Sequence, residues 1–129
     1  MKSAYLLILL IAMTSCTNYS GPYSGNYEAN QKLLLALKNN GANLSKLHSI
    51  EHHFDCTTKQ CFEQTIKLGK LAGYEVKYEG ETEQKTWVLD LVKSSIPDVK
   101  LIENQCIEME SIEEKTGAHY DGWGTEIEK

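Results

Sequence analysis

The spacing of apolar residues alternates along the chain between the period of a helix and the period of a strand. Helical spacing predicts three helices, at residues 28–40, 57–73 and 95–117. Alternation of apolar and polar residues predicts four strands, at residues 47–54, 74–78, 86–93 and 119–127. After the first helix, the order is β-α-β-β-α-β. We therefore expect one α+β domain of the ferredoxin-like type, a four-stranded antiparallel sheet with two helices on one face, and an extra N-terminal helix.

Two cysteines flank the predicted start of the second helix. Thr57 and Gln60 form a capping-box pattern, which places Cys56 at N′ and Cys61 at N4. Side chains at these two positions normally meet, so we expect them to be close enough for a disulfide, and two free thiols remain the alternative. Closing so short a loop contributes at most about 2 to 3 kcal/mol. Cys106 lies on the apolar stripe of the third helix and is expected to be a buried free thiol.

The histidines of the first predicted strand are divided between the two faces of the sheet. Alternation turns His52 toward the helices and turns Glu51 and His53 toward the open face, together with Glu75 and Lys77. We expect His52 to be packed in the core with its ring nitrogens hydrogen-bonded. Since His52 and His53, as adjacent strand residues, cannot both bind one ion without a bulge, and no H-x-H or C-x-x-C pattern occurs, we predict no metal site and no cofactor.

Charge and motifs narrow the class of function. All 13 basic residues are lysines, against 18 acidic residues, and the net charge is -5. Without arginine or a basic stripe, direct contact with nucleic acid is not expected. No nucleophile elbow or glycine-rich phosphate loop is present, so we expect a protein that is not an enzyme. Catalysis by cysteine or histidine is the least favoured alternative.

The N-terminus has the pattern of an export signal. Lys2 precedes ten apolar residues at 4–13, a run too short to span a bilayer as a helix. The following Met-Thr-Ser-Cys resembles a bacterial lipoprotein signal, which predicts a signal peptide at residues 1–15 and lipidation of Cys16. Residues 16–27 are predicted to form a flexible tether. An ordinary signal peptide with a chance cysteine is the alternative. This pattern predicts a membrane lipoprotein of the bacterial envelope that faces the periplasm or the exterior.

Three strings together resemble one known family. They are S-I-E-H-H-F at residues 49–54, L-A-G-Y-E-V at 71–76 and Y-D-G-W-G-T at 120–125. In this order and spacing they resemble the regulator of ribonuclease activity B family, and the likeness covers residues 28–129. The resemblance implies a ferredoxin-like domain that binds a protein, since the best-known members are cytoplasmic inhibitors of ribonuclease E. A cytoplasmic location is therefore the alternative to the envelope.

The resembling strings suggest a surface for recognising a partner. Glycines on both sides of Trp123 allow positive φ and leave its indole free to cover a neighbouring surface. We therefore predict a protein-binding patch of Glu51, His53, Asp121 and Trp123, with Trp123 as a purely structural plug as the alternative. A second hypothesis for the function is a small acidic envelope inhibitor or immunity protein that neutralises a basic toxin or nuclease.

Overall fold

The computed structural model describes residues 26–129. The predicted signal peptide at residues 1–15 and Cys16 lie outside the described residues, as does all but the end of the predicted tether. The elements in chain order are α2 (Asn26–Asn39), β1 (His48–Cys56), α3 (Lys59–Leu71), β2 (Glu75–Glu81), β3 (Trp87–Ser95), α4 (Val99–Thr116) and β4 (His119–Thr125). All the helices and strands predicted from the sequence are present. β1 extends two residues beyond its predicted end.

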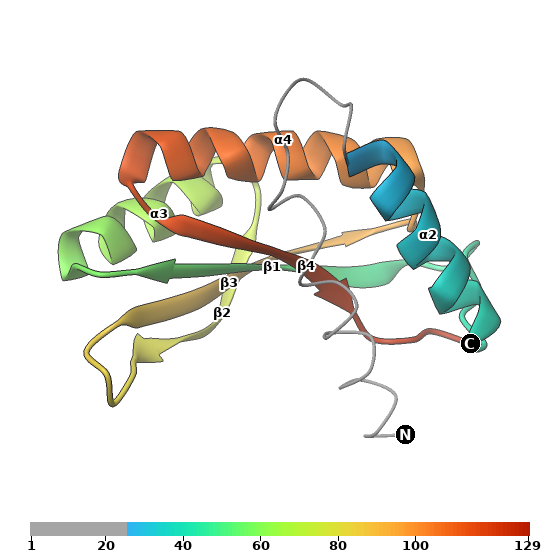
Figure 1. Ribbon diagram of the computed structural model, residues 1–129, viewed down its shortest axis with the longest axis horizontal. Coiled ribbons are helices and arrows are strands. Elements are labelled where there is room, and N and C mark those ends of the chain that lie inside the picture. Colours follow the sequence, from blue (N-terminus) through green and yellow to red (C-terminus); the bar gives the residue numbers. More distant parts are fainter. Residues whose placement is uncertain (1–25) are drawn as a thin grey trace.

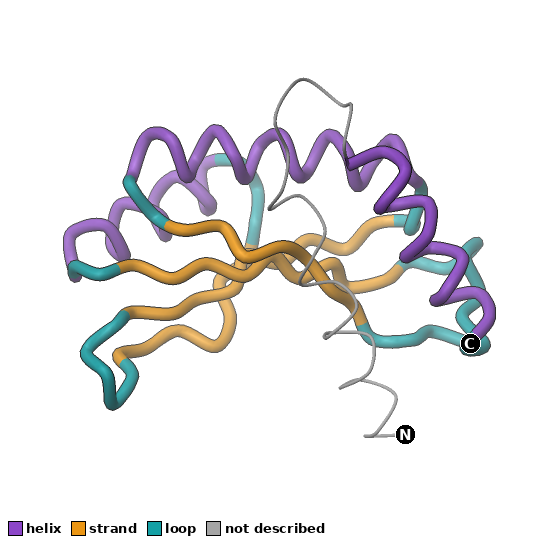
Figure 2. Tube along the Cα trace, in the orientation of Figure 1, coloured by secondary structure: helices purple, strands orange, loops and turns teal. Residues whose placement is uncertain are grey.

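The four strands form one antiparallel sheet in the order β2-β3-β1-β4. The three helices lie on the same side of this sheet, as Figures 1 and 2 show. This is the predicted ferredoxin-like arrangement with an extra N-terminal helix. We call the side of the sheet that faces away from these helices the open face. No helix of residues 26–129 is long and apolar enough to cross a bilayer.

The core lies between the sheet and the helices. Its largest fully buried apolar side chains come from α2, β1, β3, α4 and β4. They are Leu37, Ile50, Leu89, Leu91, Ile102, Met109, Tyr120 and Trp123. In β1 and β3 these residues alternate with polar ones, as a half-covered antiparallel sheet requires. The alternation therefore decides which side chains remain available on the open face.

The helix boundaries come from side-chain caps. Thr58, not the predicted Thr57, is the N-cap of α3, and its hydroxyl accepts a hydrogen bond from the Cys61 N–H at 3.1 Å. The prediction was wrong by one residue because β1 continues through Cys56 and moves the start of the helix along the chain. Asp98 caps α4 by accepting from the N–H groups of its first turn, and Gly117 ends α4 with a φ of 80°.

The cysteines join the end of β1 to the first turn of α3. Cys56 and Cys61 form a disulfide, with 5.8 Å between their Cα atoms. Cys106 is fully buried on α4, and its Sγ lies 3.7 Å from the Tyr120 hydroxyl oxygen. The prediction that Cys106 is a free thiol was wrong, because no cysteine of the described chain is free. An apolar stripe on a helix predicts that a cysteine is buried, but it does not predict whether the thiol is free or in a disulfide.

The residues after β4 are fastened beside the start of β1. The Asn43 N–H donates to the Glu128 carbonyl at 2.6 Å, and the Glu128 N–H donates to His48 Nε2 at 3.1 Å. His48 is buried and its Nδ1 lies 2.9 Å from the Lys46 carbonyl. These contacts require His48 to donate through Nδ1 and accept through Nε2. They fix the C-terminal residues next to the loop between α2 and β1.

Candidate protein-binding surface

The register of the sheet gathers charged side chains from four strands on the open face. His53 in β1 lies opposite Asp90 in β3, and Asp90 lies opposite Lys77 in β2. On the other side of β1, Asp55 lies opposite His119 at the start of β4. Residues that face one another across paired strands project on the same side of a sheet. Polar residues that are far apart in the sequence therefore become neighbours.

An imidazole–carboxylate pair lies at the centre of this face. His53 Nδ1 and Asp90 Oδ1 are 2.8 Å apart, and the two side chains are 20% and 15% exposed. Burial lowers the pKa of His53, but the hydrogen bond and the negative charge of Asp90, helped by Glu51 and Asp121, raise it above its ordinary value overall. His53 is therefore more readily protonated than a free histidine.

Glu51 lies beside this pair and has no partner of its own. Its side chain is 8% exposed, and it makes no hydrogen bond or ion pair among residues 26–129. The expectation that Glu51 is exposed was wrong, because β1 is a central strand with β3 and β4 on its two sides. Burial, followed by repulsion from Asp90, raises the pKa of Glu51, while His53 and Lys77 oppose that shift. No buried side-chain oxygen or nitrogen of the described residues lacks a hydrogen-bond partner, so the carboxylate oxygens of Glu51 reach solvent on the open face.

A shallow cavity adjoins the pair on the side of β4. Its volume is about 430 Å³. The charged and titratable side chains that line it are His53, Asp55, Asp90, His119 and Asp121. No lysine lines the cavity. Its net charge is therefore negative when the two histidines are neutral.

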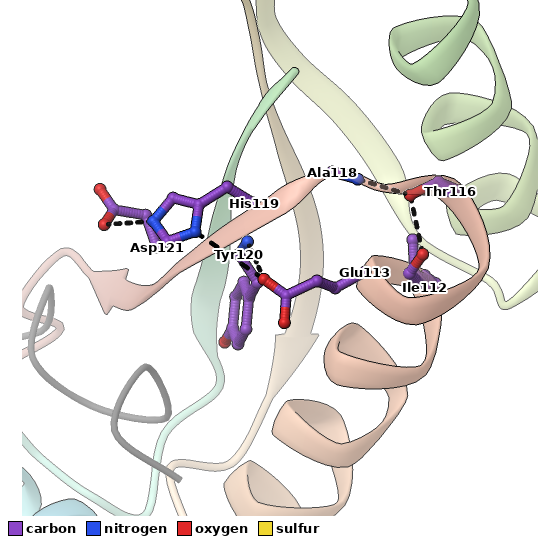
Figure 3. A network of polar contacts seen from close by, with 7 residues as sticks. All are labelled: Ile112, Glu113, Thr116, Ala118, His119, Tyr120 and Asp121. Carbon is purple, nitrogen blue, oxygen red and sulfur yellow. Dashed lines mark hydrogen bonds and ion pairs between the residues drawn. The ribbon is translucent and has the colours of Figure 1, made fainter. Parts of the chain in front are cut away.

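The connection between α4 and β4 holds the rim of this cavity in place. His119 lies between two carboxylates, with Nδ1 3.9 Å from Glu113 and Nε2 3.6 Å from Asp121, as Figure 3 shows. Glu113 also accepts a hydrogen bond from the Tyr120 N–H at 2.7 Å. Thr116 accepts from the Ala118 N–H at 3.1 Å, which closes the turn after the helix. Asp121 is consequently positioned at the cavity from the end of α4.

Trp123 does not belong to this surface. It is fully buried on the helix side, and its Nε1 donates to Asn30 Oδ1 at 3.0 Å. Asn30 in turn donates to Glu103 on α4 at 2.9 Å, and burial raises the pKa of Glu103 while this bond lowers it. The prediction that the indole is free to cover a partner was therefore wrong. Glycines beside a tryptophan indicate backbone freedom, and they do not indicate which side of the sheet the ring occupies.

His52 has the core environment that was predicted for it. Its Nδ1 is 2.7 Å from the Tyr120 hydroxyl, and its Nε2 is 2.8 Å from Gln105 Oε1. The amide oxygen accepts only, so Nε2 carries the hydrogen and the Tyr120 hydroxyl donates to Nδ1. Burial lowers the pKa of His52 to about 4, against a raising contribution from Gln105. His52 is thus a neutral structural residue.

The structure brings three of the four predicted patch residues together on the open face, namely Glu51, His53 and Asp121, and excludes the fourth. Two important residues were missed in the sequence, Asp90 and His119. An acidic residue among the apolar residues of β3 was the available signal for Asp90, but its position opposite His53 depends on register. That register joins β1 to β3, which are separated in the chain by α3 and β2, so no single turn sets it.

The His53–Asp90 pair resembles part of an acid–base system, but no thiol of residues 26–129 is free to serve as a nucleophile. Within that range, no group of three or more histidine, cysteine or acidic side chains is arranged to hold a metal ion.

Comparison with known proteins identifies a family for most of the chain. Residues 27–125 match the family model described as regulator of ribonuclease activity B. Regulator of ribonuclease activity B from Proteus mirabilis is 32% identical over 103 residues, which cover 76% of this chain and 71% of that protein. The protein of the same name from Pseudoalteromonas translucida is 29% identical over 102 residues, 76% of this chain and 92% of that one. The one from Xenorhabdus nematophila is 31% identical over 106 residues, 79% of this chain and 75% of that one.

Proposed function

Because the chain belongs to the regulator of ribonuclease activity B family, we propose that it regulates a ribonuclease by binding that enzyme as a protein partner, without catalysis of its own. The observation that supports this most directly is the arrangement of the sheet. One face is filled by helices, whereas the open face presents His53, Asp90 and Asp121 in fixed positions. A rigid sheet with charged side chains on one face suits protein recognition.

The charge of the open face favours contact with the enzyme over contact with its RNA substrate. Glu51, Asp55, Asp90 and Asp121 repel phosphate, and Lys77 is the basic residue that the register places among them. The chain contains no arginine to bind phosphate in bidentate fashion. The regulator therefore changes RNA cleavage through the enzyme.

The test of this function combines binding and activity. The full chain with Cys16→Ala is added to a ribonuclease purified from the same bacterium, and RNA cleavage and co-elution in gel filtration are measured. We expect the chain to co-elute with the enzyme and to slow cleavage in proportion to complex formed. The double variant Asp90→Asn/Asp121→Asn weakens both effects, while Glu114→Gln, an exposed position on α4, leaves them unchanged. Cleavage of RNA by the chain alone, or retention of RNA without the enzyme, contradicts the proposal.

We further propose that Cys16 carries a lipid that anchors the domain in the bacterial envelope through a tether at residues 16–27. The support is the sequence pattern of residues 1–16. A single acyl chain holds a protein weakly, so stable anchoring requires more than one.

The anchor is tested by labelling growing cells with a palmitate analogue and by separating their membranes. We expect label and membrane association in the natural chain and neither in Cys16→Ala. Lipidation uses the Cys16 sulfur in a thioether, and such a sulfur cannot also form a disulfide. Peptide mapping that finds Cys16 in a disulfide, or an uncleaved chain in the cytoplasm, contradicts the anchor and leaves the regulatory proposal intact.

A further inference from the structure

We infer that the open face is a receptor for a basic, arginine-containing segment of the protein partner, with Glu51, Asp90 and Asp121 as the carboxylates that bind its guanidinium groups. This inference rests on the proposed function, since it names the chemistry of the partner that the regulator binds. It concerns the part of the sheet between Glu51 and the acidic cavity.

Glu51 presents a carboxylate that reaches solvent on the open face and is held there by a largely buried residue. This side chain is 8% exposed, projects on the open face and has no hydrogen bond or ion pair among residues 26–129. Its pKa is raised by burial and by the nearby charge of Asp90. A basic side chain that docks beside it supplies the missing partner and stabilises the carboxylate.

Two further carboxylates, Asp90 and Asp121, have oxygen atoms available next to Glu51. Asp90 Oδ1 accepts from His53, and the second carboxylate oxygen makes no hydrogen bond with residues 26–129. Asp121 is 38% exposed, and its Oδ1 lies 3.6 Å from Nε2 of His119 on the same strand. Asp90 of β3 and Asp121 of β4 both line the cavity of about 430 Å³. A planar guanidinium with five N–H donors matches such a set better than an ammonium group does.

The lysines of β2 and β3 leave much of the open face without a positive charge. Lys93 of β3 projects toward the helices, where its Nζ lies 4.1 Å from the centre of the Tyr74 ring. It therefore does not neutralise the open face. Lys77 is opposite Asp90 at the far side, toward the β2 edge. The part of the face between β1 and β4 is left acidic, which favours association with a positively charged surface.

Binding is measured by fluorescence anisotropy with a labelled nine-residue peptide that alternates arginine and serine, added to the full chain with Cys16→Ala. A peptide in which citrulline replaces arginine keeps the shape and removes the charge. We expect the arginine peptide to bind, the citrulline peptide not to bind, and a lysine peptide to bind more weakly. Glu51→Gln and Asp121→Asn each weaken binding of the arginine peptide about tenfold, as loss of one charged hydrogen bond predicts.

The matched control is Glu114→Gln, which removes one charge from α4 on the other side of the sheet. We expect it to change the affinity by less than about twofold, since exposed and distant charges are screened. Equal losses in Glu51→Gln and Glu114→Gln, or equal binding of the arginine and citrulline peptides, overturn the inference. Thermal unfolding of each variant verifies that it is folded, and Glu51→Gln keeps the volume of the side chain.

The outcomes separate this inference from the proposed function. If the ribonuclease forms a complex whose affinity is unaffected by Glu51→Gln and the arginine peptide does not bind, the regulatory function stands and the basic receptor is refuted. If the arginine peptide binds with the expected variant effects but no ribonuclease is bound or slowed, the receptor stands and the regulatory function is refuted.

Discussion

His52 and His53 are adjacent in the chain, yet the two faces of β1 give them opposite properties. His52 is enclosed between Tyr120 and Gln105, and burial lowers its pKa to about 4. His53 lies against Asp90 on the open face and has a raised pKa despite its partial burial. The contrast shows that the local sequence sets only which face a residue occupies. The partners supplied by other strands and helices then determine its chemistry.

The largest expected effect tests whether the helix side is purely structural. Trp123→Ala removes a fully buried ring and leaves Asn30 Oδ1 without its donor, so we expect a loss of about 3 to 5 kcal/mol in the free energy of unfolding. Urea unfolding measures it. Val88→Ala, at a partly exposed position on the open face, serves as the control and is expected to cost much less. A stable Trp123→Ala variant that no longer binds its partner would contradict the structural role.

The next effect is the pH dependence that His52 imposes on stability. Its pKa is about 4 in the folded chain and close to 6.5 when unfolded, so the unfolded state binds more protons between these values. Stability contributed by neutral His52 is complete above pH 6.5 and decreases by about 3 kcal/mol in total as pH falls through 4. Imidazole NMR signals and urea unfolding at several pH values check this. Titration of His52 near its ordinary pKa refutes the buried, neutral assignment.

A smaller effect isolates the hydrogen bond to His52. Tyr120→Phe removes the hydroxyl that donates to Nδ1 and leaves a buried acceptor unsatisfied, for an expected cost of about 1 to 3 kcal/mol. The measurement is thermal unfolding, with the His52 titration followed in the same variant. The companion variant is His119→Gln at the exposed start of β4. Equal destabilisation by both substitutions would show that the buried hydrogen bond between Tyr120 and His52 contributes no more to stability than an exposed contact does.

The smallest effect belongs to the open face. His53→Gln removes the ion pair with Asp90, and we expect it to cost at most about 1 kcal/mol because the pair is partly solvated. The sign of its pH dependence is opposite to that of His52. A raised folded pKa means that the stabilisation is present below pH 6.5 and is lost as pH rises through the pKa of His53.

The same titration affects recognition of a basic segment. The charged groups that interact with or lie near His53 come from β1, β2, β3 and β4: Glu51, Asp55, Lys77, Asp90, His119 and Asp121. Protonation of His53 adds a positive charge beside the proposed receptor, so the arginine peptide should bind more weakly as pH falls. His53→Gln should flatten that profile. An unchanged profile in this variant assigns the pH dependence to the carboxylates instead.

The sequence correctly predicted which face of the sheet each side chain of β1 occupies. It did not predict which residues of the neighbouring strands these side chains contact. Alternation alone placed His52 in the core and His53 on the open face. Asp90 was missed because its position depends on the register of β1 with β3. Trp123 was misplaced because a register shift between β4 and β1 turns both Tyr120 and Trp123, three residues apart, toward the helices. The cap of α3 shifted by one residue for a related reason, since the end of β1 is set by pairing with β3.

The strand order has a consequence for the order of assembly. β1 is the first strand of the domain, and its outer neighbour β4 is the last, fastened further by the contact between Glu128 and His48. Pairing of such distant segments is slow compared with local helix formation. During synthesis, β1 therefore keeps an unpaired edge until β4 has left the ribosome. A chaperone or an export machine that acts on unfolded polypeptide has that whole interval in which to engage the chain.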